Sequence, residues 1–209
     1  MKHLGRIVRQ SAVVCLFATF ASAQSVDAFL GFGTAVAPSN GVATDTFGTG
    51  TLYNAPKLAG LFMKTGASVM FTPHFGAGGE VSWRAGKGGY DGLQYRPLFY
   101  DFNAIYHPLR TSERRIVPEL QAGLGGMNMR FYESQTACDN FAGCSNATAF
   151  VESSNHLQVH FGAGVKIYAY KNFFIRPQAD VHYVHNLFQF GSSWVPEYGA
   201  SVGYTFGSR

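Results

Sequence analysis

Hydrophobic and polar residues alternate with a period of two along much of the chain after residue 24, as in β-strands that have two different faces. From Phe75 to Ala85 the odd positions are apolar or small, while the even positions include Glu80 and Arg84. The same separation recurs in 157–167, in 173–183 and in 197–206. The apolar face of these four segments carries no charged residue. Their two faces are therefore expected to meet two different environments.

Four segments with weaker alternation fill the gaps and bring the number of expected strands to eight, namely 26–37, 58–72, 95–107 and 116–131. In the last of them the apolar phase changes after Gly125 and Gly126, where Met127 and Met129 continue on the other parity. One extra residue in a strand produces such a change, so the pattern predicts a β-bulge at the two glycines.

Three prolines fall inside the expected strands, Pro97, Pro118 and Pro177. Proline cannot donate a hydrogen bond to a neighbouring strand and is therefore confined to edges, bulges or strand starts. Each proline lies near an expected strand end. We expect the strand boundaries to move there while the number of strands stays the same.

The connections between the expected strands alternate in length. Short connections are expected at 73–74, 108–115 and 170–172, and long ones at 38–57, 86–93, 132–155 and 186–196. Transmembrane barrels have this asymmetry, with short periplasmic turns and longer extracellular loops. A soluble β-sandwich also alternates apolar and polar residues. The composition of the polar face is therefore needed to distinguish a sandwich from a transmembrane barrel.

The polar face is rich in glycine, which weakens a strand and has no use on a solvated surface. In a closed barrel of eight strands the interior is just filled by side chains, and glycine there leaves room for longer neighbours. Charges of both signs stand on the same face, and buried charges are tolerated when they are paired. We expect a polar lumen network that fills the barrel, in preference to a proton or ion path, formed by Glu80, Arg84, Asp101, Glu119, His160, Lys166, Arg176, Asp180, His182 and Glu197.

Aromatic residues gather at the expected strand ends, as in the girdles of membrane barrels, namely Phe71, Phe75, Tyr106, Phe173 and Phe206. In hydrocarbon an unpaired backbone group costs several kcal/mol, so a spanning sheet has to close on itself. The sequence therefore predicts an all-β protein, an eight-stranded antiparallel up-and-down transmembrane β-barrel.

Composition supports this prediction and limits the partners. Charged residues make up 13% of the 209 residues, against about 25% in average soluble domains. No lysine-rich stripe is present, so nucleic acid is not an expected partner.

The chain begins with a pattern typical of a secretory signal. Lys2, Arg6 and Arg9 precede an apolar run over 12–20, which is followed by Ala21-Ser22-Ala23. We expect a signal peptide over 1–23 and a barrel domain over 24–209. Cleavage would remove three basic residues and lower the formal net charge from +4 to +1.

The last expected strand runs from Tyr198 to Phe206 and alternates apolar residues toward an aromatic end. It resembles the closing strand of the eight-stranded outer-membrane β-barrels, the family of the OmpA membrane domain and OmpX-like proteins. The resemblance implies residence in the bacterial outer membrane, with an anchoring or surface role. It also implies that Tyr204 and Phe206 form a C-terminal signal for the outer-membrane assembly machinery. The peptidoglycan-binding activity of some relatives is not carried over, because no segment for it is found.

Cys138 and Cys144 remain after removal of the signal peptide, which contains Cys15. In an exported protein such a pair is expected to form a disulfide. The ring would stiffen the connection 132–155, either as protection against proteases or as a rigid recognition tip. A surface ligand is expected to use this connection and 38–57.

An enzymatic alternative uses Asp180, His182 and Ser201. These residues would converge if Tyr183 paired near Tyr198, as a nucleophile, base and orienting acid must. The site would be buried in a packed lumen, so we prefer hydrogen-bonded packing. A lipid-modifying hydrolase or acyltransferase therefore stays the second hypothesis.

The remaining candidates point away from a cofactor. The histidines lack the ligand spacing of a known metal site, and they are His156, His160, His182 and His185. The glycine doublets do not form a phosphate loop. Phe188, Phe190 and Trp194 are interpreted as part of the aromatic girdle.

The sequence thus favours a non-enzymatic outer-membrane barrel with a side-chain-filled lumen and long extracellular loops. Its expected partners are outer-membrane lipids and lipopolysaccharide, the assembly machinery and a surface ligand. A small-ligand carrier or channel, including a soluble lipocalin-like carrier, is the third hypothesis.

Overall fold

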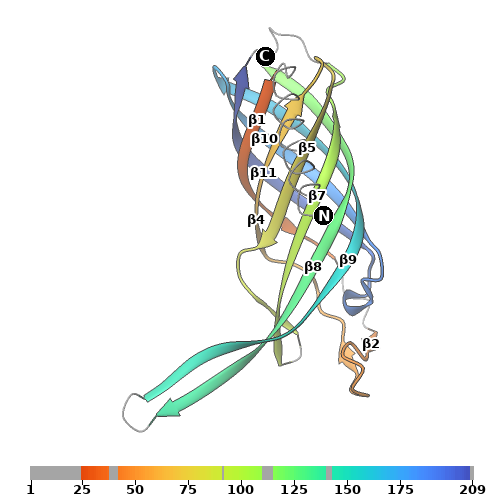
Figure 1. Ribbon diagram of the computed structural model, residues 1–209, viewed down its shortest axis with the longest axis vertical. Helices are drawn as coiled ribbons and strands as arrows, with labels where there is room; N and C mark the ends of the chain where they lie inside the picture. Colours follow the sequence, from red (N-terminus) through yellow and green to blue (C-terminus); the bar gives the residue numbers. More distant parts are fainter. Residues whose placement is uncertain (1–24, 38–41, 91, 110–114, 140–142, 208–209) are drawn as a thin grey trace, which may run out of the picture.

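Eight long antiparallel strands close into a barrel in the computed structural model, which describes residues 25–37, 42–90, 92–109, 115–139 and 143–207 (Figure 1). The expected signal peptide lies outside the described residues. Each long strand pairs with its neighbours in the chain, and β1 pairs with β11 to close the sheet. The barrel strands are β1 (Ser25–Ala35), β4 (Leu61–Met70), β5 (Phe75–Arg84), β7 (Leu93–Tyr106), β8 (Ile116–Asp139), β9 (Gly143–Tyr170), β10 (Phe173–Val184) and β11 (Trp194–Gly207).

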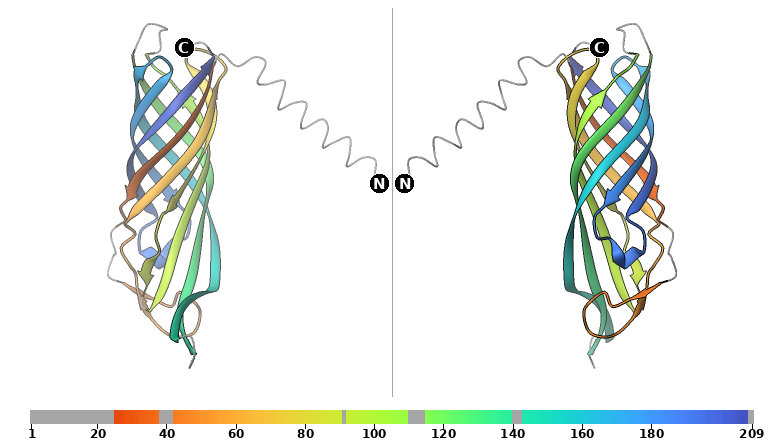
Figure 2. Two further views of the ribbon diagram at one scale, coloured as in Figure 1. Left: turned by 90° about the vertical axis from the view of Figure 1, so that its left-hand side faces the viewer. Right: turned by 90° about the vertical axis from the view of Figure 1, so that its right-hand side faces the viewer.

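The connections differ between the two ends of the barrel, as the sequence predicted (Figure 2). The C-terminal end of β11 and the short turns lie at one end, and the long connections lie at the other. The long connections contain the remaining elements, β2 (Ala43–Thr44), β3 (Tyr53–Asn54), β6 (Gly88–Tyr90) and the 3-10 turn η1 (Phe188–Phe190). Among the described residues, no helix is long and apolar enough to cross a membrane.

The two faces of the strands have the polarity that the alternation predicted, with the apolar side chains outside. Phe102 on β7 is 76% exposed and Leu157 on β9 is 67% exposed. Lys166 and Glu197, by contrast, are fully buried inside the barrel. This arrangement inverts that of a soluble domain and suits a protein whose outer surface meets lipid.

The predicted β-bulge at Gly125 and Gly126 is wrong. The β7–β8 register runs without a shift from Leu93 opposite Glu133 to Tyr106 opposite Leu120. Met127 and Met129 keep their parity and lie fully buried inside the barrel. The apparent change of phase arose because the lumen becomes apolar at this level, so inward positions there carry hydrophobic residues. The register shift that β8 does contain lies between Phe131 and Tyr132, against β9.

The strands also run through the three prolines. Pro177 is the fifth residue of β10 and pairs with Ala200 on β11. On the other side, the β9 pairing is missing at Arg176 and Pro177 and resumes at Gln178 in the same register. Proline has no backbone N–H to donate, and the sheet accommodates this by leaving two residues of β10 unpaired with β9. The strand boundaries therefore do not move, contrary to the expectation.

The connection expected over 132–155 is largely a continuation of β8 and β9 as a paired hairpin. Figure 1 shows the two strands projecting beyond the barrel. Their pairing extends to Asp139 opposite Gly143, and Cys138 and Cys144 are register partners. The disulfide itself stays a prediction.

The end with the long connections is filled by a hydrophobic cluster. Tyr95 and Phe99 from β7 pack there with Met127 and Met129 from β8, and Phe190 from η1 closes the mouth. The interpretation of Phe190 as a girdle residue is therefore wrong, because its ring is fully buried. Trp194 is exposed on the outer face, and the side chain of Phe188 lies outside the described residues. The turn end has a smaller inner cluster, formed by Phe29, Val117, Tyr168 and Phe174.

Candidate functional site

A continuous chain of ion pairs crosses the lumen between the two apolar clusters. It begins at the turn end, where Lys166 Nζ lies 2.6 Å from Asp27 Oδ2 and 2.5 Å from Glu119 Oε2. Arg176 then bridges Glu119 and Glu80, with contacts of 2.8 and 3.2 Å. Because β1, β5, β8, β9 and β10 each supply one of these side chains, the network ties distant parts of the barrel wall together.

Lys64 on β4 continues the network and holds three carboxylates with one ammonium group. Its Nζ lies 2.9 Å from Glu80 Oε1 and 3.0 Å from both Asp180 Oδ2 and Glu197 Oε1. All four side chains are at least nine-tenths buried. A lysine has three donors, so one cation can satisfy the three acceptors at once.

Alternation along single strands places these residues. Arg176, Gln178, Asp180 and His182 follow each other at every second position of β10 and all point inward. Gln178 Nε2 donates to Asp180 Oδ2 at 2.6 Å and to Glu80 Oε1 at 3.3 Å. The glycines of the inner face leave the space for such contacts. A Cβ at Gly162 would come within 2.4 Å of Asp180 Oδ1.

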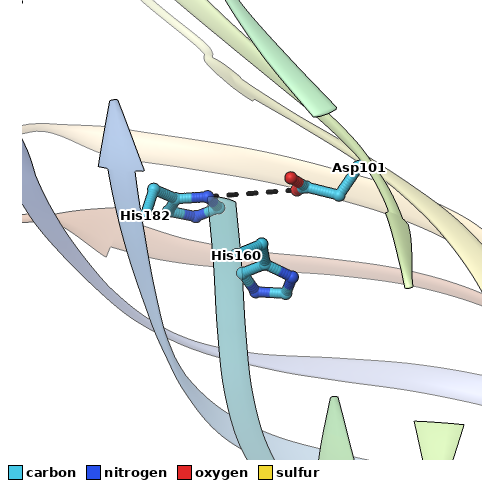
Figure 3. Close-up of side chains that lie close together, drawn as sticks. All are labelled: Asp101, His160 and His182. Carbon is cyan, nitrogen blue, oxygen red and sulfur yellow. Dashed lines mark ion pairs between the residues drawn. The ribbon is translucent and has the colours of Figure 1, made fainter. Parts of the chain in front are cut away.

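Two stacked histidines, His160 and His182, lie as a layer between the ion pairs and the apolar mouth, and Figure 3 shows them beside Asp101. The rings of His160 and His182 stack with centroids 4.8 Å apart, and His182 stacks in turn on Phe99. His160 Nδ1 lies 2.8 Å from Asn103 Oδ1, and its Nε2 lies 3.2 Å from Asp180 Oδ1. The layer therefore joins the polar network to the aromatic residues above it.

Asp101, His160 and His182 offer three potential metal ligands whose atoms lie within 4.8 Å of one another. The geometry favours a hydrogen-bonded layer over a metal site. His160 uses both ring nitrogens for Asn103 and Asp180, and stacked rings direct their lone pairs along parallel planes. His182 Nδ1 is 3.9 Å from Asp101 Oδ2, while Gln158 donates to Asp101 at 2.5 Å.

Buried carboxylates outnumber the lysine and arginine cations in the described part of the lumen. Six buried carboxylates face three lysine or arginine cations, and the three buried histidines each lie near a carboxylate. The carboxylates are Asp27, Glu80, Asp101, Glu119, Asp180 and Glu197, and the histidines are His107, His160 and His182.

The network differs from the expected set by one residue that does not join it and by three ionisable residues that the sequence reasoning missed. Arg84, expected in the lumen, lies near the mouth with its guanidinium 5.1 Å from the Tyr95 ring and outside the chain of ion pairs. The missed residues are Asp27, Lys64 and His107. Parity was the available signal for two of them, because Asp27 and Lys64 stand opposite the apolar face of their strands.

Similar proteins are found by comparing structures, and not by comparing sequences. No family model matches the sequence, and no curated protein matches it. Neisserial surface protein A (NspA) is similar in structure, with a TM-score of 0.54 and 13% identity over 87% of this chain and 96% of that chain. Ail of Yersinia pestis has a TM-score of 0.52 and 14% identity, covering 88% and 99%. OprG, an outer membrane protein of Pseudomonas aeruginosa, has a TM-score of 0.52 and 10% identity, covering 90% and 99%.

The chain has the fold of the eight-stranded outer-membrane β-barrels. The expected resemblance is thereby confirmed at the level of the fold. The apolar outer surface suits a lipid surrounding, as in the solved outer-membrane barrels of this fold. In such barrels the long connections are extracellular and the short turns periplasmic. The mouth cluster and the β8–β9 hairpin of this barrel lie at the end that carries the long connections.

The register of this outer-membrane barrel separates the residues of the enzymatic alternative. Tyr183 pairs with Trp194, so the pairing near Tyr198 on which the alternative depended is wrong. Ser201 lies opposite Arg176, and its hydroxyl donates to the Arg176 carbonyl oxygen at 3.5 Å. Asp180 pairs with Glu197 instead, four positions away from Ser201. A nucleophile, base and acid therefore do not converge at these three residues.

Proposed function

We propose that this protein is a closed, non-enzymatic outer-membrane barrel that anchors an extracellular recognition surface. The observation that carries the proposal is the filling of the lumen at successive levels. Ion pairs occupy the middle, stacked histidines lie above them, and the apolar cluster closes the extracellular mouth. Water and ions would have to displace all three layers to pass.

The filled lumen also argues against a substrate or carrier site within the barrel. A buried charge that loses its partner costs about 3–5 kcal/mol, so a ligand that broke the ion pairs would bind at a severe disadvantage. The groups that chemistry would need are already engaged with one another. We infer that the interior stabilises the scaffold and that recognition takes place outside.

The β8–β9 hairpin is the proposed recognition surface, together with the connection between β1 and β4. A paired hairpin holds its shape at lower entropic cost than an irregular loop, and rigid presentation favours binding. A barrel of this fold, Ail of Yersinia pestis, has been solved in complex with the heparin analogue sucrose octasulfate, with a TM-score of 0.51 and 14% identity over 87% of this chain and 98% of that chain. The likeness lends support to a ligand-binding role for this barrel.

The remaining partners follow from the membrane setting. We infer that outer-membrane lipids, lipopolysaccharide among them, cover the apolar face. Tyr204 and Phe206 are proposed as the assembly signal read by the outer-membrane assembly machinery. Tyr204 lies 4.8 Å from both Phe173 and Phe206, centroid to centroid, so the aromatic end of β11 forms a compact cluster on the outer face.

Planar-bilayer recording tests the closed lumen. The purified protein should give no steady conductance, and a stable, large conductance would refute the proposal.

Surface display is tested by placing single cysteines in a Cys138→Ser, Cys144→Ser background. A membrane-impermeant maleimide should label Thr148→Cys on the hairpin in intact cells, but not Leu109→Cys in the β7–β8 connection. Equal labelling of both, or labelling of Leu109→Cys alone, would contradict the orientation.

A further inference from the structure

Two arginines stand directly opposite each other on the outer face of the barrel, at the extracellular limit of its apolar surface. Arg96 on β7 is the register partner of Arg130 on β8. Two residues closer to the membrane centre, the outward row holds Trp83, Leu98 and Asn128. Further in, Phe102 and Leu124 form a fully apolar row. Two residues of strand are about 7 Å, so the guanidinium groups lie where hydrocarbon gives way to lipid headgroups.

Hydrogen bonds hold both guanidinium groups in place, and among the described residues neither group has an anionic partner. Arg96 Nε donates to the Arg84 carbonyl oxygen at 3.0 Å, and Arg130 Nε donates to Asn128 Oδ1 at 2.9 Å. Within the described part of the chain, neither arginine forms an ion pair with a carboxylate. Like charges directly opposite each other in a sheet destabilise it. An anion bound from outside the protein would therefore compensate the charges of Arg96 and Arg130.

The nearest carboxylates along these strands belong to the other face. Glu133 is the register partner of Leu93, and Glu152 is the partner of Phe131. Leu93 and Phe131 both pack in the mouth cluster. Glu133 and Glu152 therefore share a face with residues that pack inside the mouth. No carboxylate of these two rows lies on the outer face beside the arginines, which keeps its positive charge.

A recess of about 260 Å³ opens beside the two arginines and combines polar and apolar walls. Trp83, Pro97 and Leu98 supply the apolar part, and Arg96, Arg130 and Tyr132 the polar part. Lys87 adds a third cation, with its Nζ 4.3 Å from the centre of the Tyr132 ring. An amphiphile with an anionic head and an acyl chain matches both halves. Free phosphate would leave the apolar half unused.

We propose that Arg96 and Arg130 bind a phosphate group of a phosphorylated glycolipid in the outer leaflet, of the lipid A type, with an acyl chain packed against Trp83 and Leu98. Guanidinium groups suit this ligand because they bind phosphate oxygens through two parallel hydrogen bonds. The proposal rests on the orientation given under the proposed function and names one of its lipid partners. It does not depend on the hairpin as a recognition surface.

Tryptophan fluorescence can follow binding at the recess itself. The chain has two tryptophans, so a Trp194→Phe background leaves Trp83 as the reporter. The protein is folded in neutral detergent micelles and titrated with diphosphorylated lipid A, with dephosphorylated lipid A and with inorganic phosphate. Arg130→Gln and the Arg96→Gln, Arg130→Gln double variant are compared with Arg115→Gln, the same substitution at the turn end of β8. Heat-modifiable migration in gels checks that each variant is folded.

Diphosphorylated lipid A should change the Trp83 emission with a saturable curve, and the double variant should bind it at least about tenfold more weakly. The Arg115→Gln control should bind as the parent does, and dephosphorylated lipid A should bind weakly. Equal affinity of the parent and the double variant, or an equal loss in the control, would overturn the proposal. So would inorganic phosphate competing as well as lipid A, which would indicate a free-anion site.

A stability measurement separates this proposal from a merely structural role for the arginines. Without lipid A, Arg130→Gln should unfold at the same or a higher denaturant concentration, since it removes the repulsion. Lipid A should then stabilise the parent more than the variant. A loss of stability in Arg130→Gln without lipid would refute the argument. Conductance and hairpin labelling test the proposed function, and neither measurement depends on these two arginines.

Discussion

Replacing Lys64 by methionine removes the one cation that three buried carboxylates share. Its ammonium group contacts Glu80, Asp180 and Glu197 at 2.9, 3.0 and 3.0 Å. Glu80 keeps Arg176 as a partner, and Asp180 keeps His160. Glu197 keeps the Ser82 hydroxyl, which donates at 3.1 Å, and the ring of His182 at 3.7 Å. Of the three carboxylates, Glu197 therefore loses the largest part of the contacts that compensate its negative charge.

Removal of one partner from a buried ion pair costs about 3–5 kcal/mol in other proteins. We expect Lys64→Met to lower the free energy of unfolding by about this amount, because the side chain nearly keeps its volume while losing its charge and its N–H donors. The matched control is Lys87→Met, since Lys87 is exposed and an exposed lysine contributes about 1 kcal/mol at most. Urea unfolding in lipid vesicles, followed by heat-modifiable migration, measures both variants.

A second substitution identifies the origin of the loss. Glu197→Gln removes the carboxylate that Lys64→Met leaves uncompensated, while the amide keeps the size of the side chain. The double variant should regain about 1–2 kcal/mol relative to Lys64→Met alone, because the two residues are in contact and their effects do not add. A loss below about 1 kcal/mol in Lys64→Met would refute the reasoning. A double variant whose losses simply add would show that the charges do not act on each other.

Three further predictions concern the glycines, the alternative chemistry and the cysteines. Gly125→Ala should destabilise the barrel by about 1–3 kcal/mol, because its Cβ would overlap the backbone oxygen of Tyr100; Gly89→Ala, with open space around it, should be neutral in the same unfolding assay. Ser201→Ala should leave the acyl pattern of lipid A unchanged by mass spectrometry of whole cells, whereas any loss of an acyl modification would revive the hydrolase hypothesis. Reduction of the predicted Cys138–Cys144 disulfide should speed proteolysis of the hairpin and leave barrel unfolding unchanged; identical cleavage rates with and without reductant would show that no such bond constrains the hairpin.

Most of the fold could be predicted because the period of two is a strict geometric rule. A shift of one residue in a strand would turn its charged side chains toward lipid. Segments such as 157–167 therefore keep a strict alternation that predicts which face is outside. The alternating lengths of the connections then indicated the barrel and the end at which its long connections lie. Neither signal depends on close relatives of the sequence, which agrees with finding the fold where family models find nothing.

The partners within the lumen could not be predicted, because parity gives the face of a residue and not its height or rotation in the barrel. Lys64 shows this limit. It stands on the polar parity of β4, yet two of its three carboxylates come from β10 and β11. Only the closed register brings these strands to one point. The same limit produced the error at Ser201, where a misplaced register moved the residue four positions along the lumen.

The error at Met127 and Met129 has a different cause, namely the assumption that a face has one chemistry along its whole length. The inner face is polar in the middle of the barrel, where buried charges are paired, and apolar at the mouth, where the long connections fold over it. Tyr95 and Phe99 follow the same inward parity on β7 as Asp101. An aromatic run on the polar parity near the long connections is therefore better interpreted as a closed mouth than as a bulge. By that reasoning, Phe99→Ser should loosen the mouth and expose His182 to solvent, which hydrogen exchange of the β10 amides near Val184 would detect as faster exchange; unchanged exchange there would mean that the cluster does not seal the lumen.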